Sequence, residues 1–175
     1  MCGIIGVTSS NNVQDYIISS LKRLEYRGYD SSGLATISKN KLTLCRAEGK
    51  INNLISKLEK LPLEGSIGIG HTRWATHGNI SEHNAHPHVS GKVAIVHNGI
   101  IENYQKIKDE LILKGRKFTS QTDSEVIAHL FDEELSKNIS KKNATQNVLK
   151  ILEGAYAFVV LDLNEPDTLI AARNA

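Results

Sequence analysis

The sequence predicts an α+β domain made of layered sheets and helices. Segments typical of strands are grouped before and after a central block of amphipathic helices, so strands and helices do not alternate as they do in βαβ units. No internal repeat, low-complexity stretch or linker rich in Pro, Ser or Gly divides the 175 residues. We therefore treat the chain as one unit, which is long enough to bury a hydrophobic core.

The first half of the chain predicts two strand regions and two helices. Residues 2–8 form a continuous apolar run typical of a buried strand. Ile17, Leu21 and Leu24 then repeat at three and four residues, which is the helical spacing. The expected elements are a strand over 2–8, a helix capped by Asn12 that stops near Gly28, a β-hairpin of 33–38 and 42–47, and a helix over about 50–61 that ends at Pro62.

The second half begins with two short strands rich in Ile, Val and Gly, over 66–71 and 92–97, which flank a long irregular loop. Helical spacing follows, and Glu125 stands at the capping-box distance from Thr122. We expect a helix over 100–115, a second helix that has Thr122 or Asp123 as its N-cap and runs through Phe131, and a third helix over about 144–152. Strands are expected to follow over 155–161 and 169–172.

Charge and cysteine usage exclude several classes of protein. The formal net charge is only +2, and no long run of Lys or Arg occurs, so neither a nucleic acid nor an acidic membrane is the expected partner. Cys2 and Cys45 are too few for a disulfide framework and form no CxxC pair. We find no targeting or membrane-spanning segment and expect a reduced, cytoplasmic protein.

Histidine is the residue type that is most unevenly distributed. Six of the seven histidines and the only Trp fall between positions 71 and 97, mostly in the long loop. Long ordered loops inside compact domains are usually functional. Chemistry is therefore expected first in this part of the chain.

Cys2 is a candidate nucleophile. A small residue after Met1 normally allows removal of the initiator methionine, which leaves Cys2 with a free α-amino group. That amine has a reference pKa of about 7.7–8.0, so a substantial part of it can accept the proton of the thiol at neutral pH. Taken alone, Cys2 is better explained as a small buried residue at the start of a strand.

Six strings in this order make the nucleophile the better interpretation. They are Cys2-Gly3-Ile4-Ile5-Gly6, Leu24-Glu25-Tyr26-Arg27-Gly28-Tyr29-Asp30-Ser31-Ser32-Gly33, Gly70-His71-Thr72-Arg73-Trp74-Ala75-Thr76-His77-Gly78, Asn84-Ala85-His86-Pro87-His88, His97-Asn98-Gly99-Ile100-Ile101-Glu102-Asn103-Tyr104 and Thr122-Asp123-Ser124-Glu125-Val126-Ile127. Together they closely resemble the N-terminal glutaminase domain of the glutamine–fructose-6-phosphate aminotransferases, which are N-terminal-nucleophile amidotransferases. The resemblance runs over residues 1–175, implies a four-layer αββα sandwich, and indicates that the chain ends before this type-2 glutamine amidotransferase domain does.

The resemblance also implies roles for individual residues. Cys2 would attack the side-chain amide of L-glutamine, and Asn98 and Gly99 would form the oxyanion hole that a tetrahedral intermediate requires. Arg27 would lie near the nucleophile and lower its pKa. An Asn-Gly pair alone would instead indicate a β-turn.

Glutamine carries a carboxylate and an ammonium group, so its site requires one cation and one anion. By resemblance, Arg73 would hold the α-carboxylate, for which a guanidinium is well shaped, and Asp123 the α-ammonium. Thr76 and His77 would make further contacts, and Trp74 would close the site. Without the resemblance, Arg73 would be interpreted as a solvated charge in a loop, Asp123 as a helix cap and Trp74 as an aromatic residue of the core.

A metal site is the strongest alternative, because imidazole is a common ligand and His77, His83, His86 and His88 lie in one loop. The spacing does not favour it, since the loop has no HExxH motif and no paired cysteines. We expect no metal and no cofactor, and we expect His86 and His88 to order the loop by hydrogen bonds. The glycine-rich run of 65–70 lacks the rest of a nucleotide-binding fingerprint.

The family further implies partners outside this chain. Fructose 6-phosphate would bind only through isomerase domains that this sequence does not contain, where ammonia would be used to make glucosamine 6-phosphate. The full-length enzyme would be a homodimer. A third interpretation, an inert or regulatory fragment of such an enzyme, stays open at this point.

Overall fold

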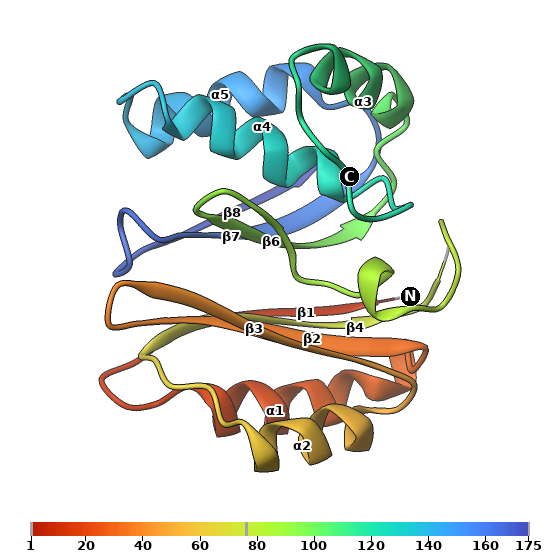
Figure 1. Cartoon of the computed structure of the whole chain (residues 1–175), viewed down its shortest axis with the longest axis vertical. Helices are drawn as coiled ribbons and strands as arrows, with labels where there is room; N and C mark the ends of the chain where they lie inside the picture. Colours follow the sequence, from red (N-terminus) through yellow and green to blue (C-terminus); the bar gives the residue numbers. More distant parts are fainter. Residues whose placement is uncertain (1, 76, 175) are drawn as a thin grey trace.

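The computed structural model describes residues 2–75 and 77–174. Two antiparallel sheets of four strands each lie face to face, and helices cover both outer faces (Figure 1). The predicted α+β class and the four-layer αββα arrangement are therefore confirmed. No helix within these residues is long and apolar enough to cross a membrane.

The first sheet has the strand order β1-β4-β2-β3, and the helices α1 and α2 cover its outer face (Figure 1). Its elements are β1 (Gly3–Thr8), α1 (Gln14–Leu24), the 3-10 turn η1 (Glu25–Arg27), β2 (Ser31–Ser38), β3 (Lys41–Glu48), α2 (Ile51–Lys60) and β4 (Ile67–Arg73). Lys39 and Asn40 form the two-residue turn of the hairpin, with positive φ angles of 49° and 58°. This is the turn geometry that matches the twist of two paired strands.

The second sheet has the order β5-β6-β7-β8 and is covered by α3, α4 and α5 (Figure 1). Its elements are the 3-10 turn η2 (Glu82–Asn84), β5 (His88–Ser90), β6 (Val93–Gly99), α3 (Tyr104–Leu113), α4 (Glu125–Leu135), α5 (Lys141–Ile151), β7 (Tyr156–Asp162) and β8 (Leu169–Asn174). The short strand β5 lies where we expected only loop.

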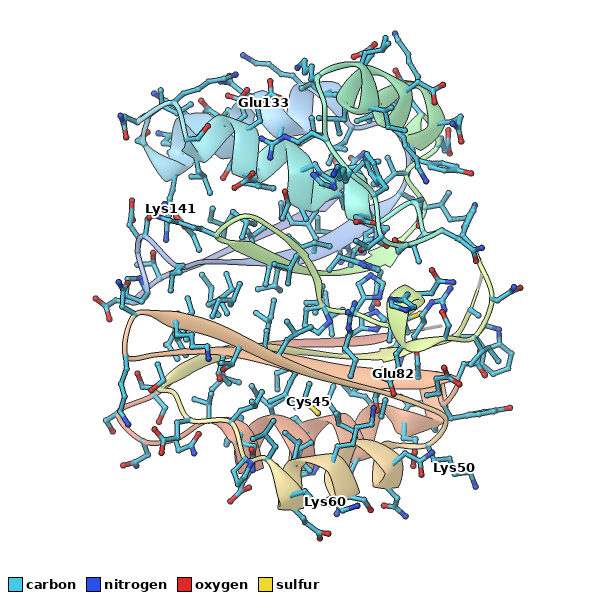
Figure 2. The ribbon with its side chains drawn as sticks, in the orientation of Figure 1. Cys45, Lys50, Lys60, Glu82, Glu133 and Lys141 are labelled. Carbon is cyan, nitrogen blue, oxygen red and sulfur yellow. The ribbon has the colours of Figure 1, made fainter. Side chains whose placement is uncertain are left out.

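Three apolar clusters hold the layers together. One packs α1 and α2 on the first sheet, one fills the space between the sheets, and one packs α3, α4 and α5 on the second sheet. The cluster between the sheets joins residues of both, among them Ala35 and Ile69 from the first and Val96 and Leu161 from the second. Cys45 lies on the helix-facing side of the first sheet (Figure 2).

The starts of α3 and α4 differ from the prediction because backbone groups find other partners. The predicted start of α3 at Ile100 is wrong: Ile100 N–H donates to Ala155 O at 2.9 Å, so this segment pairs with the chain before β7, and the helix begins at Tyr104. The predicted cap of α4 is also wrong, since Ser124 occupies the N-cap position and makes no side-chain capping bond.

Glu125 has a different partner from the one that the capping box predicts. Its carboxylate accepts hydrogen bonds from the backbone N–H groups of Thr119 and Ser120, at 2.8 and 2.7 Å, and from both of their hydroxyl groups. Burial would raise the pKa of Glu125, but these bonds and His129 lower it to about 2. Glu125 thus fixes the loop that leads into α4.

Gly33 permits the histidine loop to lie against β2. A Cβ atom at this position would lie 2.3 Å from His86 O and 2.9 Å from Cys45 O. In an open strand, Ala in place of Gly would stabilise the fold by about 0.5–1 kcal/mol. Close contact with two backbone carbonyls reverses that sign.

We therefore expect Gly33→Ala to lower the free energy of unfolding by roughly 1–3 kcal/mol, as overpacking does. Urea unfolding at neutral pH measures the change. Gly115→Ala measures backbone strain without steric contact, because Gly115 has a φ of 86° and a Cβ there meets nothing within 4 Å. An unchanged or increased free energy of unfolding in Gly33→Ala would contradict this account.

Candidate active site

One cavity of about 600 Å³ lies at the end of the sandwich where β1, β4 and β6 meet. It is lined by residues from both sheets and from the segment before α4. These are Cys2, Arg27, Arg73, Trp74, His77, His86, His97, Asn98, Gly99, Ile100, Thr122, Asp123, Ser124, Ala155, Tyr156, Ala157, Arg173 and Asn174. The structure therefore brings together every predicted site residue except Thr76, which lies outside the described residues.

Cys2 stands at the start of β1, directly beside the end of β4. Trp74 N–H donates to Cys2 Sγ at 3.1 Å, and the thiol lies 3.5 Å from Trp74 O. Burial raises the pKa of the Cys2 thiol, while the bond from Trp74 and the positive charge of Arg73 act against that rise. A half-buried thiol with a raised pKa needs a base before it can attack a substrate.

Asn98 and Gly99 end β6 and lie beside Cys2. Asn98 Nδ2 donates to Cys2 O at 2.9 Å. Gly99 has a φ of 119°, and a Cβ atom there would lie 2.2 Å from Ala155 O, so only glycine fits. The Asn98 side-chain NH2 group is thus held at the Cys2 backbone, and Asn98, Gly99 and Cys2 line the same cavity. Stabilisation of an oxyanion requires donors that are held in place in this way.

Arg73 and Asp123 provide opposite charges at the same cavity, and both are nearly fully buried. Arg73 donates to the carbonyls of His77, Asn79 and Gly78, the latter two at 3.3 and 3.4 Å, and so holds the loop after β4. Burial lowers the pKa of Arg73, and the negative charge of Asp123 is among the effects that oppose it.

Asp123 is not the helix cap that we predicted as one of its two roles. Its Oδ2 accepts from Ile101 N–H at 2.9 Å, and Ser124 Oγ donates to its Oδ1 at 3.4 Å. The carboxylate therefore bridges the segment before α3 and the start of α4. Carboxylate oxygens accept more than one hydrogen bond each, so capacity for a cationic ligand remains.

Two aromatic contacts shape the mouth of the cavity. The Trp74 side chain is 44% exposed, and its ring packs edge-on against Tyr29 with ring centroids 5.4 Å apart. The ring of His77 packs edge-on against Tyr104 at 5.6 Å. Trp74 is therefore not the core aromatic of the alternative interpretation.

Arg27 lines the cavity, but the arginine whose charge lowers the Cys2 pKa is Arg73. The sequence reasoning missed Asp30, which ties this region together. Asp30 Oδ2 accepts from Ala75 N–H at 2.8 Å, and Asp30 N–H donates to Arg73 O at 3.0 Å. Its place in the Arg-Gly-Tyr-Asp string was the available signal.

Four buried histidines, His71, His86, His88 and His97, come from β4, from the loop before β5, from β5 and from β6. The His71 and His86 rings stack with centroids 4.0 Å apart, and His88 meets His86 edge-on at 4.4 Å. His88 Nε2 lies 3.0 Å from Thr122 Oγ1, so the expected loop-ordering bond is confirmed for His88. It is wrong for His86, because neither ring nitrogen of His86 has a hydrogen-bond partner among the described residues.

Within residues 2–75 and 77–174, no group of three or more His, Cys, Asp or Glu side chains is arranged to hold a metal ion. The buried histidines instead stay neutral. Burial lowers the pKa of His71 and His88 to about 3 and that of His97 to about 4, and it lowers the pKa of His86 well below its usual value.

Comparison with known proteins gives one family and several close relatives. A family model described as a glutamine amidotransferase domain matches residues 71–175. The chain is 53% identical over 174 residues to a glutamine–fructose-6-phosphate aminotransferase (isomerizing) of Mesorhizobium japonicum and 52% identical over 173 residues to that of Zymomonas mobilis. These matches cover 99% of this chain but only 29% and 28% of the relatives.

Solved structures of amidotransferases have the same fold over almost the whole of this chain. The chain superposes on glutamine phosphoribosylpyrophosphate amidotransferase of B. subtilis, solved with ADP and GMP, with a TM-score of 0.83 and 28% identity. That match covers 99% of this chain and 37% of the other. A glutamine aminotransferase class-II domain protein of Silicibacter pomeroyi shares the fold at a TM-score of 0.67 and 15% identity, over 100% of this chain and 77% of the other.

The buried histidines predict acid sensitivity with a defined sign. In the unfolded chain histidine has a pKa of about 6.5. Between that value and about pH 4 the unfolded chain binds protons that the folded chain does not, so the free energy of unfolding falls as the pH falls. The loss is roughly 1.4 kcal/mol per buried histidine for each pH unit.

We expect His86→Leu to reduce this pH dependence by about one histidine's share and to cost little stability at pH 7, since His86 makes no hydrogen bond among the described residues. Urea unfolding at pH 7 and pH 5 measures both quantities. His83→Leu, at an exposed position of the same loop, is the control and should leave the pH dependence unchanged. If the pH dependence of the free energy of unfolding is unchanged in His86→Leu, His86 is not a buried neutral histidine that destabilises the fold at low pH.

Proposed function

Because the chain belongs to the glutamine amidotransferase domain family, we propose that it is the glutaminase half of a glutamine–fructose-6-phosphate aminotransferase. In this proposal Cys2 attacks the side-chain amide of L-glutamine and releases ammonia, then glutamate. The observation that carries it is the single cavity that holds the Cys2 thiol, the Asn98 amide and the opposite charges of Arg73 and Asp123.

The first step requires a free α-amino group on Cys2, which removal of residue 1 supplies. The amine accepts the thiol proton, and the thiolate sulfur forms a bond to the amide carbon of glutamine. The carbonyl electron pair moves onto oxygen. The resulting oxyanion accepts hydrogen bonds from Asn98 Nδ2 and Gly99 N–H, and each such donor is worth about 2.7–4 kcal/mol in comparable sites.

The intermediate then collapses. The oxyanion electron pair re-forms the carbonyl, the carbon–nitrogen bond breaks, and the leaving nitrogen takes the proton from the α-ammonium of Cys2, so ammonia departs and a thioester remains. Water then adds to the thioester carbon and loses a proton to the α-amine. Breakage of the carbon–sulfur bond releases glutamate, and the thiol regains its proton.

Glutamine is held at its two charged groups. Arg73 binds the α-carboxylate and Asp123 the α-ammonium, at a cavity that buries both side chains and so strengthens both interactions. His77 and Thr76 contribute further contacts, and Trp74 covers the mouth beside Cys2. Arg27 supports the cavity wall.

The chain spans about 29% of the length of the curated relatives that it matches. We propose that ammonia released here is used by sugar-phosphate isomerase domains that bind fructose 6-phosphate, in a homodimeric parent enzyme. The two free cysteines and the thiol chemistry support a reducing, cytoplasmic compartment.

Replacing Cys2 should abolish glutamine hydrolysis. We expect Cys2→Ala to lower glutamate release by roughly 10⁴-fold or more, as loss of a nucleophile does. The measurement is glutamate formation by protein without an N-terminal tag, with intact mass to establish that residue 1 is absent. Cys45→Ala is the matched control, because Cys45 packs under the α1 and α2 layer and does not line the cavity.

Wild-type activity in Cys2→Ala would exclude the proposed nucleophile. Failure of the mature wild type to release glutamate would instead favour the inert or regulatory fragment.

Asp123 should discriminate glutamine from an analogue that lacks the α-amino group. Asp123→Asn keeps an oxygen for Ile101 N–H but loses the charge. We expect the KM for glutamine to rise roughly 10- to 100-fold, the value of a charge-assisted hydrogen bond. The preference for glutamine over glutaramic acid, measured as the ratio of kcat/KM values, should fall by a similar factor.

Asp132→Asn makes the same charge change on α4, away from the cavity lining, and should preserve the preference. An unchanged preference in Asp123→Asn would show that Asp123 does not bind the α-ammonium group.

A further inference from the structure

His71 is buried on β4, and its side chain makes two hydrogen-bond contacts that cross from the first sheet to the second. Its Nε2 lies 3.0 Å from Asn98 Oδ1 and 3.0 Å from the backbone oxygen of His97. Both partners belong to β6. The proposed reaction assigns no role to His71, and it does not line the cavity.

These two contacts determine the protonation of the ring. A carbonyl oxygen and an amide oxygen are both acceptors, so Nε2 must carry the hydrogen and share it between them. His71 Nδ1 then has a lone pair, and it has no hydrogen-bond partner among the described residues. Burial lowers the pKa of His71 to about 3, which keeps the ring neutral at physiological pH.

We propose that His71 is a positioning residue for the oxyanion hole, which holds the Asn98 amide with its NH2 group toward Cys2. The inference rests on the proposed function for its kinetic consequence. With Oδ1 engaged by His71, Nδ2 donates one hydrogen to Cys2 O at 2.9 Å and keeps the second for the oxyanion. A flipped amide would place two donors against each other at the His71 ring.

The surroundings of His71 restrict its own rotation. The ring stacks on His86 at a centroid distance of 4.0 Å with an interplanar angle of 29°. His71 is also paired in the first sheet between Ile4 on β1 and Gly33 on β2. The Nε2–H group that orients Asn98 is therefore held in place by β4, which pairs with β1 directly after Cys2.

Three substitutions of His71 distinguish the effect of its Nε2–H donor from the effect of the packing of its ring. In His71→Gln the amide nitrogen takes the place of Nε2, in His71→Asn the amide nitrogen takes the place of Nδ1, and in His71→Met no donor remains. We expect His71→Gln to keep kcat within about threefold, and His71→Asn and His71→Met to lower kcat roughly 10- to 100-fold with KM changed less than about threefold. His129→Met, at a buried histidine outside the cavity lining, controls for general destabilisation.

A second readout does not depend on turnover. In wild-type protein with nitrogen-15-labelled histidine, the His71 Nδ1 resonance should be of the unprotonated type and Nε2 of the protonated type. The side-chain NH2 resonances of Asn98 should shift in His71→Met and return toward wild-type positions in His71→Gln.

The outcomes distinguish the two proposals. If wild type releases no glutamate, the proposed function fails, and the resonances still decide the position of Asn98. Wild-type kcat in His71→Met, an equal loss of kcat in all three variants, a protonated His71 Nδ1, or unchanged Asn98 resonances in His71→Met would each overturn the role of His71.

Discussion

Antiparallel pairing between β1 and β4 places the second residue of the chain opposite the end of the strand that carries Arg73. The register pairs Gly3 with Thr72. Cys2 therefore reaches the backbone N–H of Trp74, at a distance that a freely moving chain end would not keep. Gly28 completes the arrangement, because a Cβ there would lie within 3 Å of the Arg73 and Trp74 backbones. The other residues of the cavity, such as Asn98 and Asp123, lie around the end of this pair of strands.

Burial explains the chemical state of the polar residues near the site. A charge without a partner is costly in a buried environment, so the imidazoles of His71, His86, His88 and His97 remain neutral. Arg73 and Asp123 are also buried, but they line the cavity, where the negative charge of Asp123 opposes the effect of burial on the pKa of Arg73. The site therefore combines neutral hydrogen-bonding groups inside the sandwich with charged groups at its end.

The sequence predicted the layers, and the residues proposed for the site, Thr76 apart, line one cavity. It did not predict the hydrogen bonds that connect those residues to other segments. Strands and helices followed from periodicity, as for the apolar run of β1 and the Ile17, Leu21 and Leu24 face of α1. The start of α3 could not be predicted, since Ile100 N–H donates to Ala155 O before β7. The cap of α4 could not be predicted either, since Asp123 and Glu125 accept from backbone groups outside α4. Such partners depend on how distant segments meet, which local propensity does not describe.

The histidines illustrate the same limit. Their crowding indicated a functional loop, and hydrogen bonds were expected for His86 and His88 alike. In the folded chain His88 meets the hydroxyl of Thr122 in the segment before α4, whereas His86 stacks on the ring of His71. Cys2 and Asn98 also belong to different sheets, and the apolar cluster of residues such as Ala35 and Val96 sets the spacing of those sheets. The position of Cys2 relative to the Asn98 amide therefore depends on the packing between the two sheets. A substitution that changes the volume of this cluster would change the distance between the two residues, although it replaces no residue that contacts the substrate.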